Sequence, residues 1–122
     1  MKLLLVVPPQ IIKSAPGIDS RPTISIPLGV LYMAAYLREK DWDGEFKVYD
    51  GRLSANLTDY PDGSTLFGDT WETVKRTICD FEPDVIGISN MFSWQIDAAI
   101  QLSQICKVAC PDAITILGGP HA

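Results

Sequence analysis

Short apolar stretches separated by amphipathic segments run along the chain, and they predict alternating strands and helices. Lys2–Val7 and the run that follows Pro83-Asp84 are continuously apolar and too short to be helices, which predicts buried strands. The second run, within Pro83–Trp94, lacks apolar/polar alternation, so we expect both of its faces to be covered. Glu45–Asp50 alternates, which predicts an edge strand, and Ala113–Leu117 predicts a fourth strand.

Three segments between these strands have apolar residues at helical spacing. Pro27 suits the first position of a helix that runs to about Glu39, and a wide apolar stripe predicts that this helix packs on the sheet. Asp69 and Glu72 form a D-x-x-E start signal for a second helix, and Ser93 suits the cap of a third. The apolar faces are Leu28, Leu31, Tyr32, Ala35 and Leu37 in the first helix, Trp71, Val74, Ile78 and Phe81 in the second, and Ile96, Ala99, Ile100, Ser103 and Cys106 in the third.

The order β-α-β-α-β-α-β predicts an α/β fold, with a flavodoxin-like (Rossmann-like) parallel sheet between two helical layers. Right-handed crossovers give the spatial strand order 2-1-3-4. Segments 10–26 and 51–68 follow the carboxyl ends of the first two strands and are predicted to be long loops. Because long loops at one edge of such a sheet carry function, we expect the ligand site there.

The composition fits one globular domain with a real core. The chain has 122 residues, is 47% hydrophobic and has a net charge of −5. Its lysines and arginines are scattered, which predicts no nucleic-acid partner, because phosphate binding needs clustered cations. A short apolar run, Leu3–Val7, precedes a proline pair, so we expect no signal peptide, no membrane span and a cytoplasmic location. The cysteines are expected to be buried free thiols.

Several catalytic signatures are absent from the sequence. It contains no phosphate-binding loop, no G-x-G-x-x-G after the first strand, no C-x-x-C and no H-E-x-x-H. The residues around Ser89 lack the second glycine of a nucleophile elbow, and His121 is the only histidine. We therefore expect no catalysis by this chain alone.

Small and polar residues at the carboxyl ends of the strands remain as candidates for ligand binding. Glycine lets the backbone approach a ligand closely, and the Ser89 hydroxyl could bond an aromatic nitrogen or a phosphate oxygen. A structural explanation stays open for each: Gly118-Gly119 as a turn, Ser89 as a strand end and Asp50 as a loop start. Met91, Phe92 and Trp94 are more often core residues than a cofactor platform.

Five stretches of the sequence, taken as one ordered set, are informative when compared with known families: Leu4–Pro9, Pro27–Leu37, Val48–Asp50, Pro83–Ser89 and Leu117–Ala122. In this order they resemble the amino-terminal cobalamin-binding domain of cobalamin-dependent radical SAM enzymes. The likeness spans almost the whole chain and is weakest in the two long loops.

The resemblance implies a domain that holds cobalamin over the carboxyl edge of the sheet, with the nucleotide tail in a cleft beside the first and third strands. It places Ser89-Asn90-Met91 where cobalamin domains have Ser-x-Leu, and Gly118-Gly119 on their glycine pair, both lining the tail. His121 is implied to line the pocket as well. The cofactor-binding residues so implied are Pro8, Pro9, Gly29, Asp50, Gly51, Arg52, Ser89, Asn90, Met91, Gly118, Gly119, Pro120 and His121; no catalytic or metal-ligating residue is expected.

The chain departs from the cobalamin mutases and methionine synthases after its first strand. Those proteins have a cobalt-ligating histidine in a D-x-H-x-x-G motif there, whereas residues 8–13 of this chain are PPQIIK. The resemblance to the radical SAM branch therefore implies a cobalamin whose cobalt receives no histidine from the protein.

The C-x-x-x-C-x-x-C motif that binds the 4Fe-4S cluster and S-adenosylmethionine in that family is absent. The sequence also stops after the fourth strand, where a flavodoxin-like domain has a fifth strand and helix. We therefore expect residues 1–122 to be an incomplete cobalamin-binding domain, whose partner is a C-terminal radical SAM domain of the same protein. An unpaired fourth strand would then favour dimerisation, strand swapping or poor solubility.

Three functions stay open on the sequence. The first is the cobalamin-binding module of a radical SAM enzyme that performs methyl transfer or other radical chemistry on an unknown substrate. The second is a cofactor-free flavodoxin-like signalling or interaction domain, although Ser89 stands where a receiver domain needs a phosphorylatable aspartate. The third is an enzyme that binds a nucleotide or flavin, which lacks support from a phosphate-binding loop.

Overall fold

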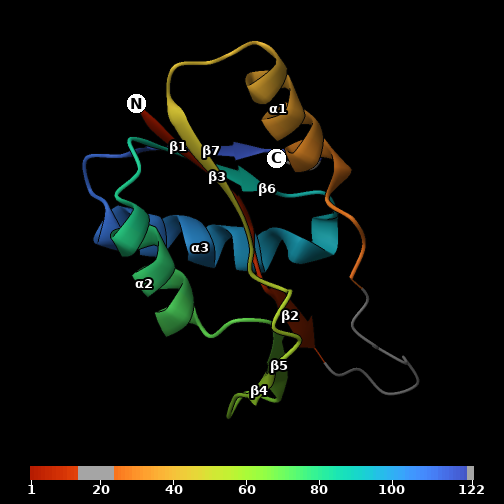
Figure 1. Ribbon diagram of the computed structural model, residues 1–122. Coiled ribbons are helices and arrows are strands. Elements are labelled where there is room, and N and C mark those ends of the chain that lie inside the picture. Colours follow the sequence, from red (N-terminus) through yellow and green to blue (C-terminus); the bar gives the residue numbers. More distant parts are fainter. Residues whose placement is uncertain (14–23, 121–122) are drawn as a thin grey trace.

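The computed structural model describes residues 1–13 and 24–120, and Figure 1 shows their arrangement. The larger sheet contains the parallel strands β1 (Lys2–Val7), β3 (Glu45–Asp50), β6 (Val85–Ser89) and β7 (Ile114–Gly118). Their order is β3-β1-β6-β7, which confirms the predicted order 2-1-3-4 and the predicted edge position of the second strand. The flavodoxin-like α/β fold is thereby confirmed.

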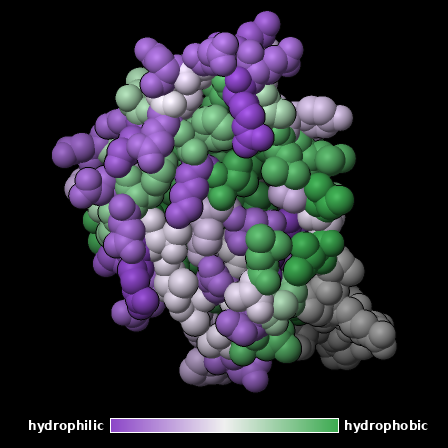
Figure 2. Space-filling model, viewed as in Figure 1, coloured by the Kyte–Doolittle hydropathy of each residue, from purple (hydrophilic) through white to green (hydrophobic). Residues whose placement is uncertain are grey.

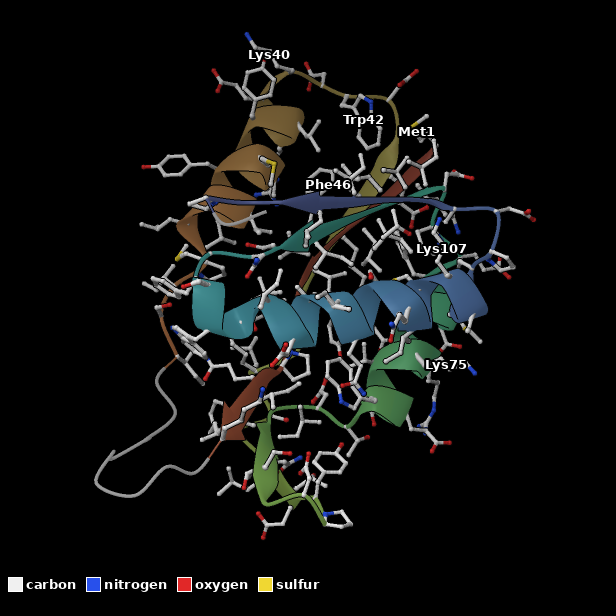
Figure 3. The ribbon with its side chains drawn as sticks, turned by 180° about the vertical axis from the view of Figure 1, so that it is seen from behind. Met1, Lys40, Trp42, Phe46, Lys75 and Lys107 are labelled. Carbon is white, nitrogen blue, oxygen red and sulfur yellow. The ribbon has the colours of Figure 1, made fainter. Side chains whose placement is uncertain are left out.

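The register of this sheet brings the carboxyl ends of its strands to one edge. Val7 lies opposite Asp50, and Ser89 lies opposite Gly118. Met1 and Trp42 lie at the other, amino edge, as the view from behind in Figure 3 shows. Residues that directly follow the four strands therefore meet at the carboxyl edge.

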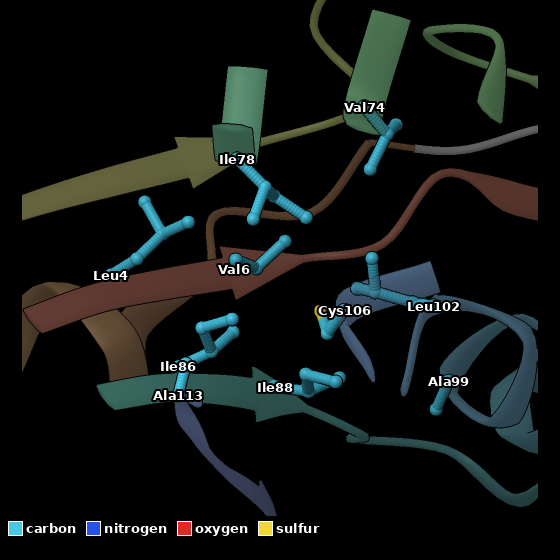
Figure 4. Close-up of a cluster of buried hydrophobic side chains, with 10 residues drawn as sticks. All are labelled: Leu4, Val6, Val74, Ile78, Ile86, Ile88, Ala99, Leu102, Cys106 and Ala113. Atoms are coloured by element: carbon cyan, nitrogen blue, oxygen red, sulfur yellow. The ribbon is translucent and has the colours of Figure 1, made fainter. Parts of the chain in front are cut away.

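Helices cover the two faces of the sheet unequally. α2 (Trp71–Phe81) and α3 (Ile96–Ala109), which follows the 3₁₀ turn η1 (Ser93–Gln95), pack on one face, and α1 (Leu28–Glu39) lies on the other (Figure 1). The main core lies under α2 and α3 (Figure 4) and consists of Leu4, Val6, Val74, Ile78, Ile86, Ile88, Ala99, Leu102, Cys106 and Ala113. The cluster on the α1 side is smaller and consists of Leu5, Val7 and Val30.

This unequal cover changes one expectation for the strand β6. Ile86 and Ile88 face the main core and are fully buried, whereas the residues that alternate with them are only half-buried. The prediction that both faces of this strand are covered is therefore wrong for the α1 side. The continuous apolar run predicts a central strand but not how completely helices cover it.

The apolar pattern predicts the buried face of α2 but not that of α1. α2 buries Val74 and Ile78, as predicted, because charged residues occupy its other side. α1 instead buries Val30 and Ala34. The positions predicted for burial in α1 are exposed or half-buried: Leu28, Leu31, Tyr32, Ala35 and Leu37. Apolar residues occur nearly all round this helix, so its sequence does not select one face.

The helix starts also differ in detail from those predicted. Thr70, and not Asp69, caps α2, because its Oγ1 accepts a hydrogen bond of 3.3 Å from the backbone N–H of Thr73. Ser93 opens η1 and caps no helix, so α3 begins after that turn. α1 begins directly after Pro27.

A second, antiparallel sheet occupies parts of both segments that are predicted to be loops. It contains β2 (Gln10–Lys13), β5 (Ser64–Phe67) and β4 (Leu57–Asp59), in the order β2-β5-β4. The loop prediction is wrong for these strands, because they are short and β2 pairs with a strand far along the chain, which no local pattern reveals. Residues 14–23 of the first segment lie outside the described residues.

The outer side of α1 carries exposed apolar residues. Figure 2 shows them as green surface at the upper right of the molecule, over α1. α1 has 12 residues, and within the described parts of the chain no helix is long and apolar enough to cross a membrane.

The three cysteines are free thiols in different surroundings. Cys106 is buried in the main core, and burial raises the pKa of its thiol to about 11. Cys110 is half-buried and Cys79 is exposed. The expectation of buried thiols is therefore confirmed for Cys106 and wrong for Cys79.

The face of α3 that packs on the sheet gives a test of this fold. α3 buries Leu102, which the sequence pattern does not single out, whereas the predicted Ile100 is 46% exposed. We predict that Leu102→Ala lowers the free energy of unfolding by about 2–5 kcal/mol, because it leaves a cavity in the core.

Ile100→Ala on the same helix is the matched control, and its effect is expected to stay below about 1 kcal/mol. Urea unfolding followed by circular dichroism measures both variants. A loss at Ile100 that equals or exceeds the loss at Leu102 would contradict the orientation of α3.

Candidate functional site

A cavity of about 490 Å³, called the α1 cavity below, lies between α1 and the neighbouring face of β1, β6 and β7. It occupies the part of this face that α1 leaves uncovered, and its volume suits a small-molecule ligand. Six residues predicted to bind a cofactor line it: Gly29, Ser89, Met91, Gly118, Gly119 and Pro120. Its other lining residues are Leu3, Leu5, Pro27, Val30, Met33, Val85, Gly87, Ile88 and Ile116.

The side chains that line the α1 cavity are uncharged and mostly apolar. Ser89 contributes a hydroxyl that can donate or accept a hydrogen bond. Acid–base catalysis needs titratable side chains, so this lining suits binding of a neutral group rather than proton transfer. Nor do residues 1–13 and 24–120 contain a group of three His, Cys, Asp or Glu side chains that could hold a metal ion.

Two glycines on the wall of the cavity face open space. A Cβ built on Gly29 or on Gly118 meets no atom within 4 Å. Gly29 lies in α1, where glycine lowers helix stability by roughly 0.5–1 kcal/mol relative to alanine. Neither residue is needed for packing within the described parts of the chain, and a side chain at either position would extend into open space.

Gly119, in contrast, is needed by the fold. Its φ of +109° lies in the left-handed region, and a Cβ there would lie 2.3 Å from the carbonyl oxygen of Asn90. The backbone N–H of Asn90, a buried residue, donates a hydrogen bond of 2.7 Å to the Gly118 carbonyl oxygen. The hydrogen bond from Asn90 to Gly118 therefore joins the ends of β6 and β7 at one end of the cavity, and Gly119 allows the close approach of the two backbones.

A buried ion pair lies at the carboxyl end of β3, outside the lining of the cavity. Arg52 Nη2 and Nε donate to the two carboxylate oxygens of Asp50 at 2.8 and 2.9 Å, and these side chains are 3% and 6% exposed, respectively. Arg52 Nη2 also donates to the Ser25 carbonyl oxygen at 2.8 Å. Because Ser25 lies shortly before α1, this pair holds the start of the helical wall of the cavity.

Three further predicted site residues pack beside this pair. Pro8 and Pro9 are buried, and a Cβ on Gly51 would lie 2.9 Å from Pro9 Cδ. These residues bring the ends of β1 and β3 into close contact. They do not line the α1 cavity, and His121 lies outside the described residues, so the cofactor contacts expected of these residues stay predictions.

The loop after β6 contains residues whose surroundings differ from expectation. Met91 lines the cavity, whereas Phe92 and Trp94 are 40% and 54% exposed, so the prediction that these two belong to the core is wrong. Val30 and Met33, also on the cavity wall, are not singled out by the sequence pattern. The sequence signal that could have pointed to this part of α1 is Gly29, which is a weak helix former among residues that otherwise favour a helix.

Two polar pairs connect strands β3 and β2 to residues at or near the starts of α2 and α3. The Tyr49 hydroxyl donates to the Asp69 carboxylate, and Lys13 forms an ion pair with Asp97 on α3. Burial, together with the Asp69 acceptor, raises the pKa of Tyr49 above its ordinary value. The hydrogen bond to Asp97 raises the pKa of Lys13. The Tyr49 hydroxyl and the Lys13 ammonium therefore stay protonated at neutral pH. Their interactions hold neighbouring segments together and involve no proton transfer at that pH.

Comparison with known proteins gives a family and two relatives. Residues 16–122 match the B12 binding domain family. Cytidylyl-2-hydroxyethylphosphonate methyltransferase of Streptomyces wedmorensis is 33% identical over 105 residues, which is 83% of this chain and 19% of that protein. An uncharacterized methyltransferase of Pyrococcus horikoshii is 33% identical over 123 aligned positions, which is 99% of this chain and 22% of that protein. The chain thus spans about a fifth of the length of these relatives, and no solved structure matches it.

The two adjacent glycines after β7 give a matched test of the site geometry. We predict that Gly119→Ala lowers the free energy of unfolding by more than about 1 kcal/mol, because the new methyl group meets the Asn90 carbonyl in a strained backbone conformation. Gly118→Ala points into open space and is expected to change this free energy by less than about 0.5 kcal/mol. Thermal and urea unfolding measure both; equal effects would count against the close approach of Gly119 and Asn90.

Proposed function

The chain belongs to the B12-binding domain family, and we propose that it is the cobalamin-binding module of a radical SAM enzyme that transfers methyl groups. Its family membership, together with two relatives that are named methyltransferases, supports a cobalamin-binding module. The radical SAM reaction and the methyl transfer are our proposal for the whole protein.

The α1 cavity is where we propose that the nucleotide tail of cobalamin binds. The observation that carries this assignment is the open space in front of Gly29 and Gly118, on opposite walls of the cavity, which a single Cβ would begin to fill. The uncharged lining fits a neutral aromatic base and its sugar better than it fits a nucleotide triphosphate or a metal ion.

The residues of the chain act on the tail by holding it in place. In this proposal the Ser89 hydroxyl hydrogen-bonds a polar atom of the tail, and Met33 and Met91, which also line the cavity, supply adaptable apolar contacts. Bound cobalamin supplies a cobalt centre that can carry a methyl group. The cavity lining orients the cofactor and excludes water from its tail.

Other predicted site residues act indirectly in this proposal. Asp50 and Arg52 hold the chain at Ser25, and thereby the start of α1, while Asn90 fixes the ends of β6 and β7. A buried ion pair of this kind is sensitive to loss of one partner, because the remaining charge is left buried and unpaired.

We propose that the 4Fe-4S cluster and S-adenosylmethionine bind to polypeptide other than residues 1–122. Cys106 and Cys110 have the first spacing of a C-x-x-x-C-x-x-C motif, but Ala113 occupies the third position. Cys106 is also buried in the main core. These thiols therefore do not supply a cluster site.

Binding of cobalamin with the matched glycine variants tests the proposed function. We expect the chain to bind hydroxocobalamin with a change in its visible spectrum. Gly29→Ala and Gly118→Ala are each expected to weaken this binding by at least about tenfold, because a methyl group enters the space for the tail.

The same variants should leave binding of cobinamide, a corrinoid without the nucleotide tail, within about twofold of wild type. Gly29→Ala is also expected to keep or raise the unfolding free energy, by up to about 1 kcal/mol, which separates lost binding from lost folding. Absence of hydroxocobalamin binding to the chain overturns the proposal and favours a cofactor-free interaction domain.

The ligation of cobalt gives a second, spectroscopic prediction. His121 is the only histidine of the chain, and we propose that it lines the cofactor site without binding cobalt. The electron paramagnetic resonance spectrum of bound cob(II)alamin should therefore show no splitting by a histidine nitrogen, and His121→Ala should leave the spectrum unchanged. A nitrogen splitting that disappears in His121→Ala would refute this assignment.

A further inference from the structure

Two of the three cysteines line one hollow at the amino edge of the sheet, opposite the edge where the strands end. α2 and α3 contact each other on one face of the sheet (Figure 1). Cys79 lies in the last turn of α2, and Cys110 directly follows the last residue of α3. Both residues line a hollow of about 290 Å³, together with residues that precede β6 and β7. We call this pair the Cys79–Cys110 dithiol.

A hydrogen bond shows how near the two cysteines are to each other. The Cys79 thiol donates to the Ala109 carbonyl oxygen, with 3.8 Å between sulfur and oxygen. In a trans peptide this oxygen lies about 3 Å from the Cα of the next residue, which is Cys110. The Cys79 sulfur is therefore within about 7 Å of the Cys110 Cα. Because Cys110 lies beyond the end of its helix, small rotations there can bring the two sulfur atoms into bonding distance.

The third cysteine is a poor partner for Cys110. Cys106 and Cys110 are four residues apart at the end of α3. Residues at this helical spacing have Cβ atoms about 5–6 Å apart, whereas a disulfide needs about 3.5–4.5 Å. Cys106 is also buried in the main core, where an oxidant dissolved in water does not reach it. The geometry therefore selects Cys79 as the partner of Cys110.

The surroundings of the two thiols give them different roles. Cys79 is exposed, so it can meet an oxidant from solution directly. Cys110 is half-buried, and burial, together with the nearby Cys79 and Glu82, raises the pKa of its thiol. Less of Cys110 is therefore in the reactive thiolate form at neutral pH. An accessible thiol beside a second, resolving thiol is the arrangement found in proteins that respond to oxidants.

We propose that the Cys79–Cys110 dithiol is a redox-active site that forms a reversible disulfide, with a low-molecular-weight disulfide such as oxidised glutathione as the oxidant. The Cys79 thiolate attacks one sulfur of oxidised glutathione, which breaks the S–S bond and releases one glutathione thiolate. The Cys110 thiolate then attacks the Cys79 sulfur of this mixed disulfide and releases the second glutathione thiolate. The protein loses two electrons, the oxidant gains them, and the two glutathione thiolates take up the two protons. No step needs the proposed cofactor.

The disulfide would join the ends of α2 and α3. It would close a loop from residue 79 to residue 110, which contains all of β6 and α3. Such a cross-link stabilises a fold mainly because it restricts the unfolded chain. We expect oxidation to raise the midpoint of thermal unfolding by about 5 °C or more. Excess dithiothreitol should reverse the rise.

Mass spectrometry after incubation with oxidised glutathione tests the pairing. Free thiols are first blocked with iodoacetamide, and the chain is then digested without reduction. A glutamate-specific protease cuts after Glu82, which separates Cys79 from Cys106, and trypsin cuts after Lys107, which separates Cys106 from Cys110. The expected product links the Cys79 peptide to the Cys110 peptide. One of the three thiols should then react with iodoacetamide, and only after unfolding.

Serine variants separate the two steps. Cys110→Ser should stop at the mixed disulfide and accumulate one glutathione on Cys79. Cys79→Ser should accumulate little adduct, because the remaining thiols are half-buried or buried. Cys106→Ala is the matched control and should form the disulfide as the wild type does. In each serine variant the oxidised and reduced samples should unfold at midpoints within about 1 °C of each other.

Three results would overturn this inference. The first is a link between Cys106 and Cys110, and the second is a wild type that keeps glutathione on Cys79 without closing the bond. The third is a disulfide that lowers the thermal midpoint, because the folded chain would then have to distort to form it. Hydroxocobalamin binding is measured on the reduced chain, so the proposed function can fail or hold independently of all three.

Discussion

A parallel sheet normally has both of its faces covered, and the unequal cover that this chain gives to its two faces determines where its candidate site lies. α2 and α3 bury the centre of one face, so that Leu4, Ile86 and Ile88 are out of contact with water. On the other face, among the described helices, α1 reaches over β1 and β3, and Ile116 on β7 stays 53% exposed. The α1 cavity is the part of this face that is left open, so the candidate site follows from the number and placement of the helices.

The order of elements could be predicted from the sequence, because strands of a parallel sheet are short apolar runs and helices have a distinct spacing. The buried side of a helix was predictable only where polar residues defined the other side, as in α2 around Val74 and Ile78. α1 and α3 are apolar on several sides, so their orientation depends on tertiary packing. The small sheet was unpredictable because its strands pair across segments far apart in the sequence.

The position of the candidate site at the ends of the strands was predictable. Which of these residues face the cavity and which hold the fold together was not. Gly118 and Gly119 are identical in sequence terms, yet one faces open space and the other is required by its backbone conformation and by the Asn90 carbonyl. Asp50 and Arg52 were expected at the ligand, and they bind each other and the carbonyl of Ser25. Such differences depend on distances between distant segments, which a single sequence does not contain.

If the α1 cavity holds the ligand as proposed, binding there would link the amount of folded protein to the supply of that ligand. Residues around an open cavity lack the van der Waals contacts of a filled core, and Gly29 weakens its helix in addition. A ligand that binds only the folded chain raises its stability by about 2.7 kcal/mol at a hundredfold excess over Kd. Because changes of about 1–2 kcal/mol alter cellular abundance several-fold, proteolysis would remove this domain preferentially from cells that are starved of the ligand.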